Sequence, residues 1–244
     1  MERSSDEFLT KLRNVEENYK MIEAHIAHAA EKSGRQRSDI TFLAATKTVE
    51  PAVINHAIKQ GLRYIGENRV QELLSKYDEY DLENADLQFI GHLQTNKVKQ
   101  IVGKVSLIQS VDSVKLASEV ARQAKLHNKT QDILVEVNIG REENKSGVMP
   151  EALGELIDEI KDIDGIFIKG LMTIPPICEE KSEICKYFED MHKIFIDISG
   201  KKSDNVSMDI LSMGMSDDYY EAILCGANMV RIGSLLFGKR NYAL

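Results

Sequence analysis

Residues 40–68 read ITFLAATKTVEPAVINHAIKQGLRYIGEN, and this stretch contains one complete strand–helix–strand unit. Its two apolar runs, at 40–47 and 63–68, are nearly continuous, as is typical of strands buried on both faces. Between the runs, Pro51 stands at a favourable first helical position and Gly61 stands where that helix should end. The stretch therefore predicts two buried strands joined by a helix.

The same unit recurs along the rest of the chain. Eight apolar runs alternate with amphipathic stretches, and eight strands joined by helices within about 200 residues fit a (β/α)8 TIM barrel, an α/β fold. A doubly wound open sheet would need a Gly-rich nucleotide turn after its first strand, and ATKTVEP is not one. The runs are ITFLAATK (40–47), RYIGEN (63–68), LQFIGHLQ (87–94), SLIQSVD (106–112), DILVEVNIG (132–140), IFIKGLMTI (166–174), VSMDILSMG (206–214) and MVRIGSLLFG (229–238).

An extra N-terminal helix is predicted over residues 5–33, ahead of a barrel over residues 40–244. No low-complexity linker marks a boundary, so residues 1–244 are expected to form a single domain. The apolar side of the N-terminal helix consists of Phe8, Leu12, Val15, Tyr19, Ile22 and Ile26.

Composition excludes several classes of function. The chain has 244 residues, 43% of them hydrophobic, and a net charge of -8, so a nucleic-acid surface is not expected. No apolar run approaches membrane-spanning length, and the polar N-terminus is not a signal peptide. Cys178, Cys185 and Cys225 fit no zinc or redox spacing, which indicates reduced thiols in a cytoplasmic protein without a metal site.

Two unusual segments close the last two predicted strands. They are LSMGMSDD (211–218) after strand seven and RIGS (231–234) after strand eight, where TIM barrels commonly bind phosphate. Gly214 and Gly233 let the backbone approach an anion closely, and amides before a helix add a favourable dipole.

Hydroxyl groups in these segments are further candidates. Ser212 and Ser234 could donate hydrogen bonds to the same anion. The competing interpretation of LSMGMSDD is helix capping, by Ser216 or Asp217, of the helix that continues to Gly226. Both interpretations can hold together, and the pair of segments favours phosphate.

Lys47 ends strand one at the same barrel mouth. Alone it would be taken as a lysine whose stem packs along the strand end. Opposite a phosphate site, desolvation would lower its pKa, and a neutral amine can form a Schiff base with an aldehyde. A phosphorylated aldehyde bound to lysine describes either pyridoxal 5′-phosphate (PLP) or a sugar-phosphate aldolase intermediate.

Arg231 helps to separate these two alternatives. Strand alternation places it on the same side as Gly233, where its guanidinium could reach the pyridine nitrogen of PLP. A sugar phosphate offers no such partner. Asn68, after strand two, could hydrogen-bond a ring substituent of the same cofactor. The competing interpretation is that Arg231 pairs with a carboxylate inside the barrel.

Taken together, these residues resemble the pyridoxal phosphate homeostasis protein family over about residues 5–243. The resemblance implies a barrel similar to the N-terminal domain of alanine racemase, with PLP bound as an aldimine of Lys47. It also implies phosphate contacts at Ser212, Met213, Gly233 and Ser234, a pyridine contact at Arg231 and a ring contact at Asn68. The chain departs from the family at Leu87-Gln88 and Thr46. The motifs are LAATKT, GENRVQELL, FIGHLQTNK, VDSVKLA, GLMTI, LSMGMSDD and VRIGSLLFG.

The resemblance implies a PLP carrier that takes part in vitamin B6 and amino-acid homeostasis, without robust catalysis. A PLP-dependent racemase or decarboxylase is the alternative, and a Schiff-base aldolase is a third. Racemisation needs an acid/base on each face of the cofactor. Lys47 can serve one face, and the chain ends at GKRNYAL, without the second domain that supplies the other in alanine racemase. We therefore expect no catalytic residues, a monomer, and either passive release of PLP or handover to apo PLP-dependent enzymes.

Overall fold

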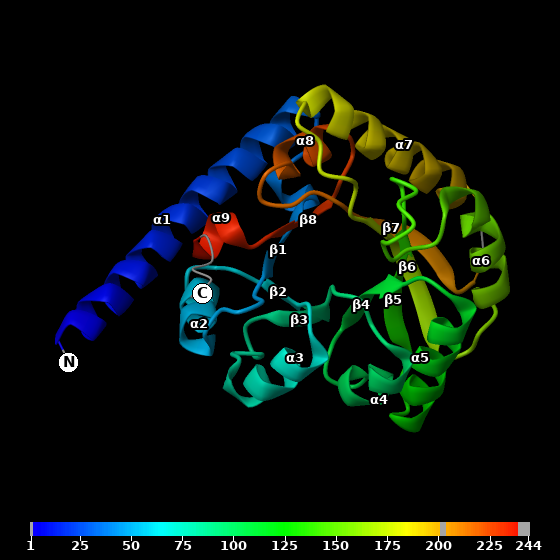
Figure 1. Cartoon of the computed structure of the whole chain (residues 1–244), viewed down its shortest axis with the longest axis horizontal. Coiled ribbons are helices and arrows are strands. Elements are labelled where there is room, and N and C mark those ends of the chain that lie inside the picture. Colours follow the sequence, from blue (N-terminus) through cyan, green and yellow to red (C-terminus); the bar gives the residue numbers. More distant parts are fainter. Residues whose placement is uncertain (1, 201–203, 239–244) are drawn as a thin grey trace.

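Eight parallel strands close into a barrel in the order in which they occur in the chain (Figure 1). The computed structural model describes residues 2–200 and 204–238. The (β/α)8 barrel predicted from the sequence is confirmed, and each predicted run overlaps one strand. The strands are β1 (Thr41–Ala45), β2 (Tyr64–Glu67), β3 (Asp86–Phe89), β4 (Leu107–Val111), β5 (Gln131–Val137), β6 (Ile166–Thr173), β7 (Val206–Ser212) and β8 (Met229–Ile232).

Helices surround the barrel, and the predicted N-terminal helix is present as α1 (Glu2–Lys32) (Figure 1). Short 3-10 helices occupy Arg37–Asp39, Tyr77–Glu79, Thr95–Lys97 and Pro150–Ala152. The other helices are α2 (Pro51–Lys59), α3 (Val70–Lys76), α4 (Val98–Ile101), α5 (Val114–Leu126), α6 (Leu153–Ile160), α7 (Lys181–Ser199), α8 (Tyr219–Leu224) and α9 (Ser234–Phe237).

The last apolar run contains both a strand and a short helix. The apolar run extends to residue 238, but β8 ends at Ile232, within the predicted closing segment RIGS, and the backbone turns helical at Ser234 to form α9. The amides of Leu236 and Phe237 donate back to the carbonyl of Gly233, so this segment leaves the sheet where its pairing with β1 ends.

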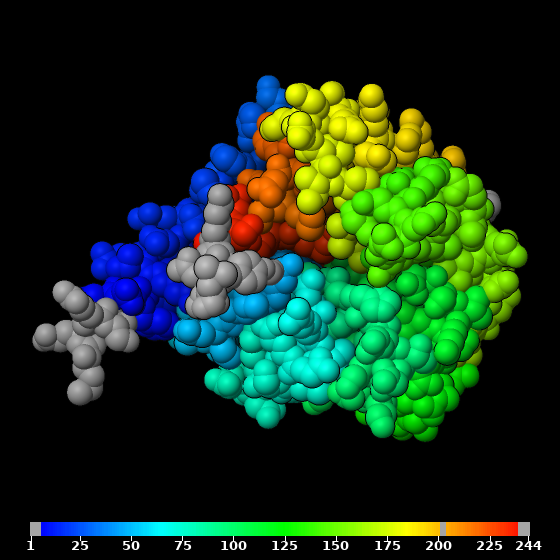
Figure 2. All heavy atoms as spheres, in the orientation of Figure 1, coloured from blue at the N-terminus to red at the C-terminus, as the bar shows by residue number. Residues whose placement is uncertain are grey.

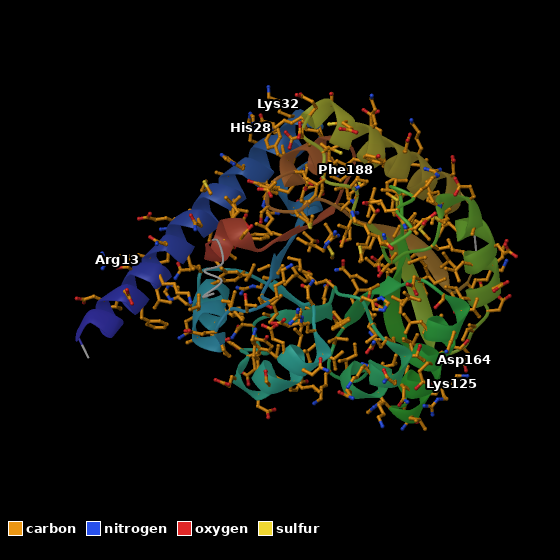
Figure 3. The ribbon with its side chains drawn as sticks, in the orientation of Figure 1. Arg13, His28, Lys32, Lys125, Asp164 and Phe188 are labelled. Carbon is orange, nitrogen blue, oxygen red and sulfur yellow. The ribbon has the colours of Figure 1, made fainter. Side chains whose placement is uncertain are left out.

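Alternation along the strands produces two apolar cores. The outer core lies between the strands and the helices, and it includes Phe42 and Ala44 of β1. The inner core fills the barrel with residues of alternating position, among them Leu43 of the same strand. Phe188 of α7 is fully buried in the outer core (Figure 3). Burial on both faces explains why the strand sequences are continuous rather than alternating.

Helix α1 packs across α2, α8 and α9, and its N-terminal end extends beyond the body of the barrel (Figure 2). Its predicted apolar side is confirmed, with Val15, Ile22 and Ile26 buried. Polar contacts reinforce this packing. His28 of α1 (Figure 3) lies 2.6 Å from the hydroxyl of Tyr220, and Arg35 donates to the carbonyl of Ala227 at 2.8 Å, just after α8.

Two further findings concern the described residues as a set. None of their helices combines the length and apolar character needed to span a bilayer. In residues 2–200 and 204–238, His, Cys, Asp and Glu side chains form no group of three or more that is arranged to hold a metal ion.

We predict that Gly170→Ala lowers the free energy of unfolding by at least about 2 kcal/mol. Gly170 lies at an irregularity in the pairing of β6 with both neighbours, with φ +150°, and an added Cβ would lie 1.9 Å from the carbonyl oxygen of Ile210. Urea unfolding measures this. The control is Gly154→Ala in α6, where an added Cβ would meet no atom within 4 Å beyond the adjacent residues and the helix's own backbone, and it should stabilise by about 0.5–1 kcal/mol. Equal effects of the two changes would contradict the prediction.

Candidate functional site

Strand register brings the predicted residues of strands one, two and eight to one end of the barrel. Ala45 pairs with Gly66 of β2, and the amide of Thr46 donates to the carbonyl of Gly66. On the other side, a Cβ on Gly233 would lie 3.0 Å from the carbonyl oxygen of Ala45. The half-buried Lys47 therefore follows a strand end flanked by the ends of β2 and β8.

Arg231 is buried inside the barrel, with only 4% of its surface exposed. One of its terminal nitrogens donates to the Ser212 hydroxyl at 2.6 Å, and the other donates to the Thr173 carbonyl at 2.9 Å. The alternative interpretation was a direct ion pair between Arg231 and a carboxylate. In the structure, Arg231 instead donates to a hydroxyl and to a carbonyl. Burial lowers the pKa of Arg231 to about 10, an effect opposed by the charges of Glu136 and Asp218, so the guanidinium stays charged at neutral pH.

A chain of polar side chains continues from Arg231 across the barrel interior. The Ser212 hydroxyl donates to Gln109 Oε1 at 2.7 Å, and Gln109 Nε2 donates to Gln88 Oε1 at 2.7 Å. These contacts satisfy the polar groups that the buried guanidinium brings into the barrel. The glutamines were missed at the sequence level, although a polar residue at an inward position of an apolar run is a usable signal.

Glu136 of β5 is a second buried ionisable group in this interior. Burial raises its pKa to about 7, the negative charge of Asp112 adds to this, and Arg231 opposes it. Its Oε2 atom has no hydrogen-bond partner. A carboxyl group in this state exchanges a proton near neutral pH. Glu136 was not among the site residues predicted from the sequence.

The two glycine-containing segments meet as predicted, but a serine hydroxyl joins them. The amide of Arg231 donates to the carbonyl of Gly214 at 3.0 Å. Ser216 Oγ accepts hydrogen bonds from the amides of Gly233 and Leu235, both at 3.2 Å. These amides thus form a pair that can hold an oxygen atom. Gly214 has φ +92°, and its Cβ would lie 2.5 Å from Ala222, so only glycine fits there.

The prediction that Ser216 or Asp217 caps the helix after this segment was wrong. The Ser216 hydroxyl accepts from amides at the start of α9 instead of capping α8, and Asp218 is the residue before α8. Its carboxylate accepts from the amide of Met215 at 2.6 Å. Burial raises the pKa of Asp218, while the Met215 amide and Arg231 lower it.

Not all predicted contact residues present their side chains to one point. The Met213 side chain lies fully buried in the outer core, so its backbone is the part at the strand end. The Ser212 hydroxyl is held between Arg231 and Gln109, whereas Ser234 is exposed at the start of α9. Asn68 is half-buried after β2, and its Oδ1 atom is buried without a hydrogen-bond partner.

A buried charged network lies behind Lys47. Glu67 of β2 is fully buried, and its Oε1 atom accepts from Thr46 Oγ1 at 2.8 Å, from the Tyr80 hydroxyl at 2.7 Å and from Lys76 Nζ at 3.0 Å. Burial and the Glu67 carboxylate raise the pKa of Tyr80, which keeps its proton for this bond.

The same network fixes the residue after Lys47. Lys76 Nζ also donates to Glu72 at 2.6 Å and to the Thr46 carbonyl at 3.2 Å. The Glu72 carboxylate in turn accepts from the amide of Thr48, which has the unfavourable φ of +64° for a β-branched residue. Both neighbours of Lys47 are therefore held by groups that meet at Lys76.

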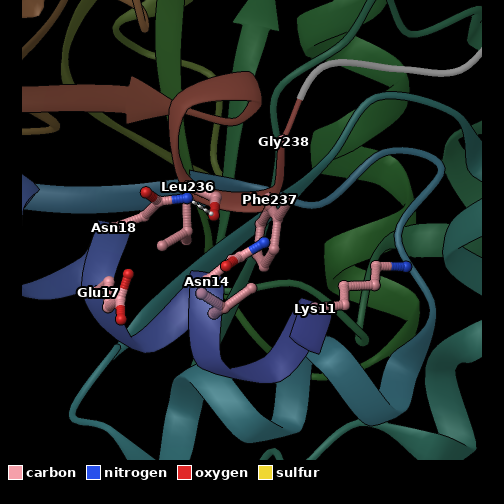
Figure 4. A pocket seen from close by; sticks show the side chains of 8 residues that line it. Lys11, Asn14, Glu17, Asn18, Leu236, Phe237 and Gly238 are labelled. Atoms are coloured by element: carbon pink, nitrogen blue, oxygen red, sulfur yellow. Dashed lines mark hydrogen bonds between the residues drawn. The ribbon is translucent and has the colours of Figure 1, made fainter. Parts of the chain in front are cut away.

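A surface pocket of about 210 Å³ lies elsewhere, between α1 and α9 (Figure 4). Asn18 donates to the Leu236 carbonyl at 3.0 Å at one side of this pocket. Its lining residues include Lys11, Asn14 and Glu17 of α1 and none of the residues predicted for the cofactor.

Comparison with known proteins places this barrel in a family. The family model "Alanine racemase, N-terminal domain" matches residues 10–241. The alanine racemase of Clostridium difficile in complex with cycloserine has the same fold, with a TM-score of 0.74 and 17% identity over 96% of this chain and 61% of that one.

More similar proteins define the family further. A pyridoxal phosphate homeostasis protein of Aquifex aeolicus is 44% identical over 94% of this chain and all of its own length. PipY of Synechococcus elongatus PCC7942, solved with PLP bound, superposes with a TM-score of 0.76 at 29% identity, over 87% of this chain and 100% of that one. The chain therefore belongs to the pyridoxal phosphate homeostasis proteins, whose barrel is of the alanine racemase N-terminal type.

We predict that Lys76→Met destabilises the fold by about 3 kcal/mol, because it leaves the Glu67 carboxylate buried without its cation. Adding Glu67→Gln should recover a large part of this loss, since the amide is neutral and still accepts from Thr46 and Tyr80. Urea unfolding of the single and double variants measures the coupling. Strictly additive losses would show that the pair does not interact.

We also predict that Glu136 makes the stability of the fold fall as pH rises. Its pKa is raised from 4.5 to about 7 in the folded chain, so the folded state holds one more proton than the unfolded state between these values. The stabilisation of the fold by the protonated Glu136 is complete below the pKa of the unfolded state, and it is lost as pH rises through the folded pKa of about 7. The measured quantity is the free energy of unfolding of Glu136→Gln minus that of the wild type. This difference should be on the order of 1–3 kcal/mol larger at pH 8 than at pH 5. Parallel pH profiles of the two proteins would contradict this.

Proposed function

We propose that this chain binds PLP at the carboxyl ends of its strands, with Lys47 joined to the aldehyde as a Schiff base, and acts as a carrier without robust catalysis. Support comes from the family, since PipY was solved with PLP bound and the curated relatives are named for PLP homeostasis. The observation that carries the proposal is the buried Arg231 beside paired backbone amides at the end of β8.

The amides at the start of α9 suit a phosphate group. In the structure, the Ser216 hydroxyl oxygen accepts from the amides of Gly233 and Leu235, as a phosphate oxygen would. Rotation of this hydroxyl would free both donors for the ligand. The missing Cβ of Gly233 lets β8 lie close to Ala45 at this point. The predicted phosphate contacts at Ser212, Met213 and Ser234 are part of the proposal.

The interior groups suit the ring of PLP. Arg231 remains a charged donor near neutral pH, so a pyridine nitrogen facing it would accept a hydrogen bond and stay unprotonated. The buried, unpartnered Asn68 Oδ1 can accept from a ring hydroxyl. PLP supplies an aldehyde and an electron-withdrawing ring, and an unprotonated nitrogen weakens that ring as an electron sink. A weak electron sink suits a carrier better than a catalyst.

A PLP-dependent enzyme remains the second candidate because of Glu136. This carboxyl group is buried inside the barrel, interacts with the charge of Arg231, and has a pKa of about 7, which suits a general acid/base. Exchange of the α-proton of amino acids with solvent deuterium tests this candidate. Exchange that Glu136→Gln abolishes would support the enzyme over the carrier.

We predict that PLP gives the protein a visible Schiff-base absorption band, and that borohydride fixes one cofactor covalently on Lys47. Lys47→Ala should lack the band and the label, because no amine at that position can attack the aldehyde. Lys99→Ala, which changes an exposed lysine of α4, is the matched control and should behave as wild type. Peptide mapping of the reduced protein identifies the modified residue.

Pyridoxal without its phosphate should bind at least about tenfold more weakly to the same protein, since it cannot use the amides of β8 and α9. Labelling that is unchanged in Lys47→Ala would overturn the assignment of the lysine. Equal binding of pyridoxal and PLP would overturn the assignment of the phosphate site.

A further inference from the structure

Two of the three cysteines come together between α7 and α8, although about 40 residues separate them in the sequence. The side chains of Cys185, in α7, and Cys225, just after α8, lie close enough for the charge of one to affect the other. Both are half-buried free thiols. Cys178 lies apart, with its thiol donating to the Pro176 carbonyl at 3.5 Å.

The register of the two helices supports this contact independently. One helical turn before the cysteines, Lys181 of α7 forms a salt bridge with Glu221 of α8. Directly after Cys225, a Cβ on Gly226 would lie 2.6 Å from the ring of His192 in α7. The absence of that Cβ lets the helices approach closely next to the thiols, as a disulfide requires. Figure 1 shows α7 and α8 side by side.

We propose that Cys185 and Cys225 form a reversible disulfide with a low-molecular-weight disulfide as oxidant, and that this bond fixes α7 to α8. The Cys185 sulfur attacks the small disulfide and breaks its S–S bond, which forms a mixed disulfide and releases one small thiol carrying the Cys185 proton. The Cys225 sulfur then attacks the Cys185 sulfur and releases a second small thiol with its own proton. Two protein thiols are oxidised and one small disulfide is reduced.

The surroundings explain this order of attack. Burial raises the pKa of Cys225 to about 12, and the charge of Cys185 and the hydrogen bond to it add to the effect, so Cys225 keeps its proton first. Both contributions from Cys185 disappear once that sulfur is in the mixed disulfide, which lowers the pKa of Cys225 and favours its attack, while burial still raises that pKa. Glu221 and then Cys185 raise the pKa of Lys181, which places a positive charge near the attacking sulfur.

The bond would join the helices that follow β6 and β7. These strands supply Thr173 and Ser212, the two hydrogen-bond partners of Arg231. Oxidation would therefore restrain the relative movement of β6 and β7 next to Arg231. The proposal does not depend on PLP binding, because its readouts are mass and thermal stability.

The test treats the full chain with oxidised glutathione near pH 8 and analyses peptides without reduction. Wild type should lose two hydrogen atoms, give a Cys185–Cys225 linked peptide, and melt roughly 5–10 °C higher, with full reversal by a dithiol. Cys178→Ser, the matched control, should form the same link. Cys185→Ser and Cys225→Ser should form no such link and show no rise in melting temperature.

Three results would overturn the proposal. One is a link that involves Cys178, and another is glutathione carried stably by both Cys185 and Cys225 in the wild type. The third is a folded protein that stays unchanged under conditions that oxidise the urea-unfolded chain.

Discussion

Pairing of the first strand with the last is the interaction on which the rest of the structure depends. Residues Thr41–Ala44 pair with Met229–Ile232, and this closes the sheet so that no long edge remains open. Closure also sets Gly233 against Ala45, at a separation that a side chain on Gly233 would disturb. Lys47 and the amides of α9 thus reach the same end of the barrel from opposite ends of the sequence.

Burying a guanidinium inside that barrel imposes the second constraint. Charge in a low-dielectric interior is stable only when its donors are satisfied, so neighbouring strands must present acceptors. Thr173 and Ser212 do so for Arg231, and Gln109 extends the chain of hydrogen bonds. The raised pKa of Glu136 has the same origin, because desolvation disfavours its charge as well. The barrel interior is therefore apolar around Leu43 and polar around Arg231.

Support for this polar region comes from outside the barrel. Lys76 Nζ donates to Glu67, Glu72 and the Thr46 carbonyl behind Lys47. Glu72 in turn accepts from the amide of Thr48, whose φ is positive. On the other side, α1 packs on α8 and α9, the two helices that flank β8. The strand ends are thus held by helix contacts that take no direct part in the proposed chemistry.

The sequence by itself determined the order of strands and helices, the N-terminal helix and the barrel, because apolar periodicity and Pro or Gly boundaries are local signals. It also pointed to Lys47 and Arg231 as candidates, since their positions at strand ends follow from counting; their roles remain predictions. Only the tertiary structure decided which groups meet: Ser216 with the amides at the start of α9, Lys76 with Glu67, and Cys185 with Cys225. The physical reason is that such partners are selected by strand register and helix packing, which depend on contacts between distant parts of the chain.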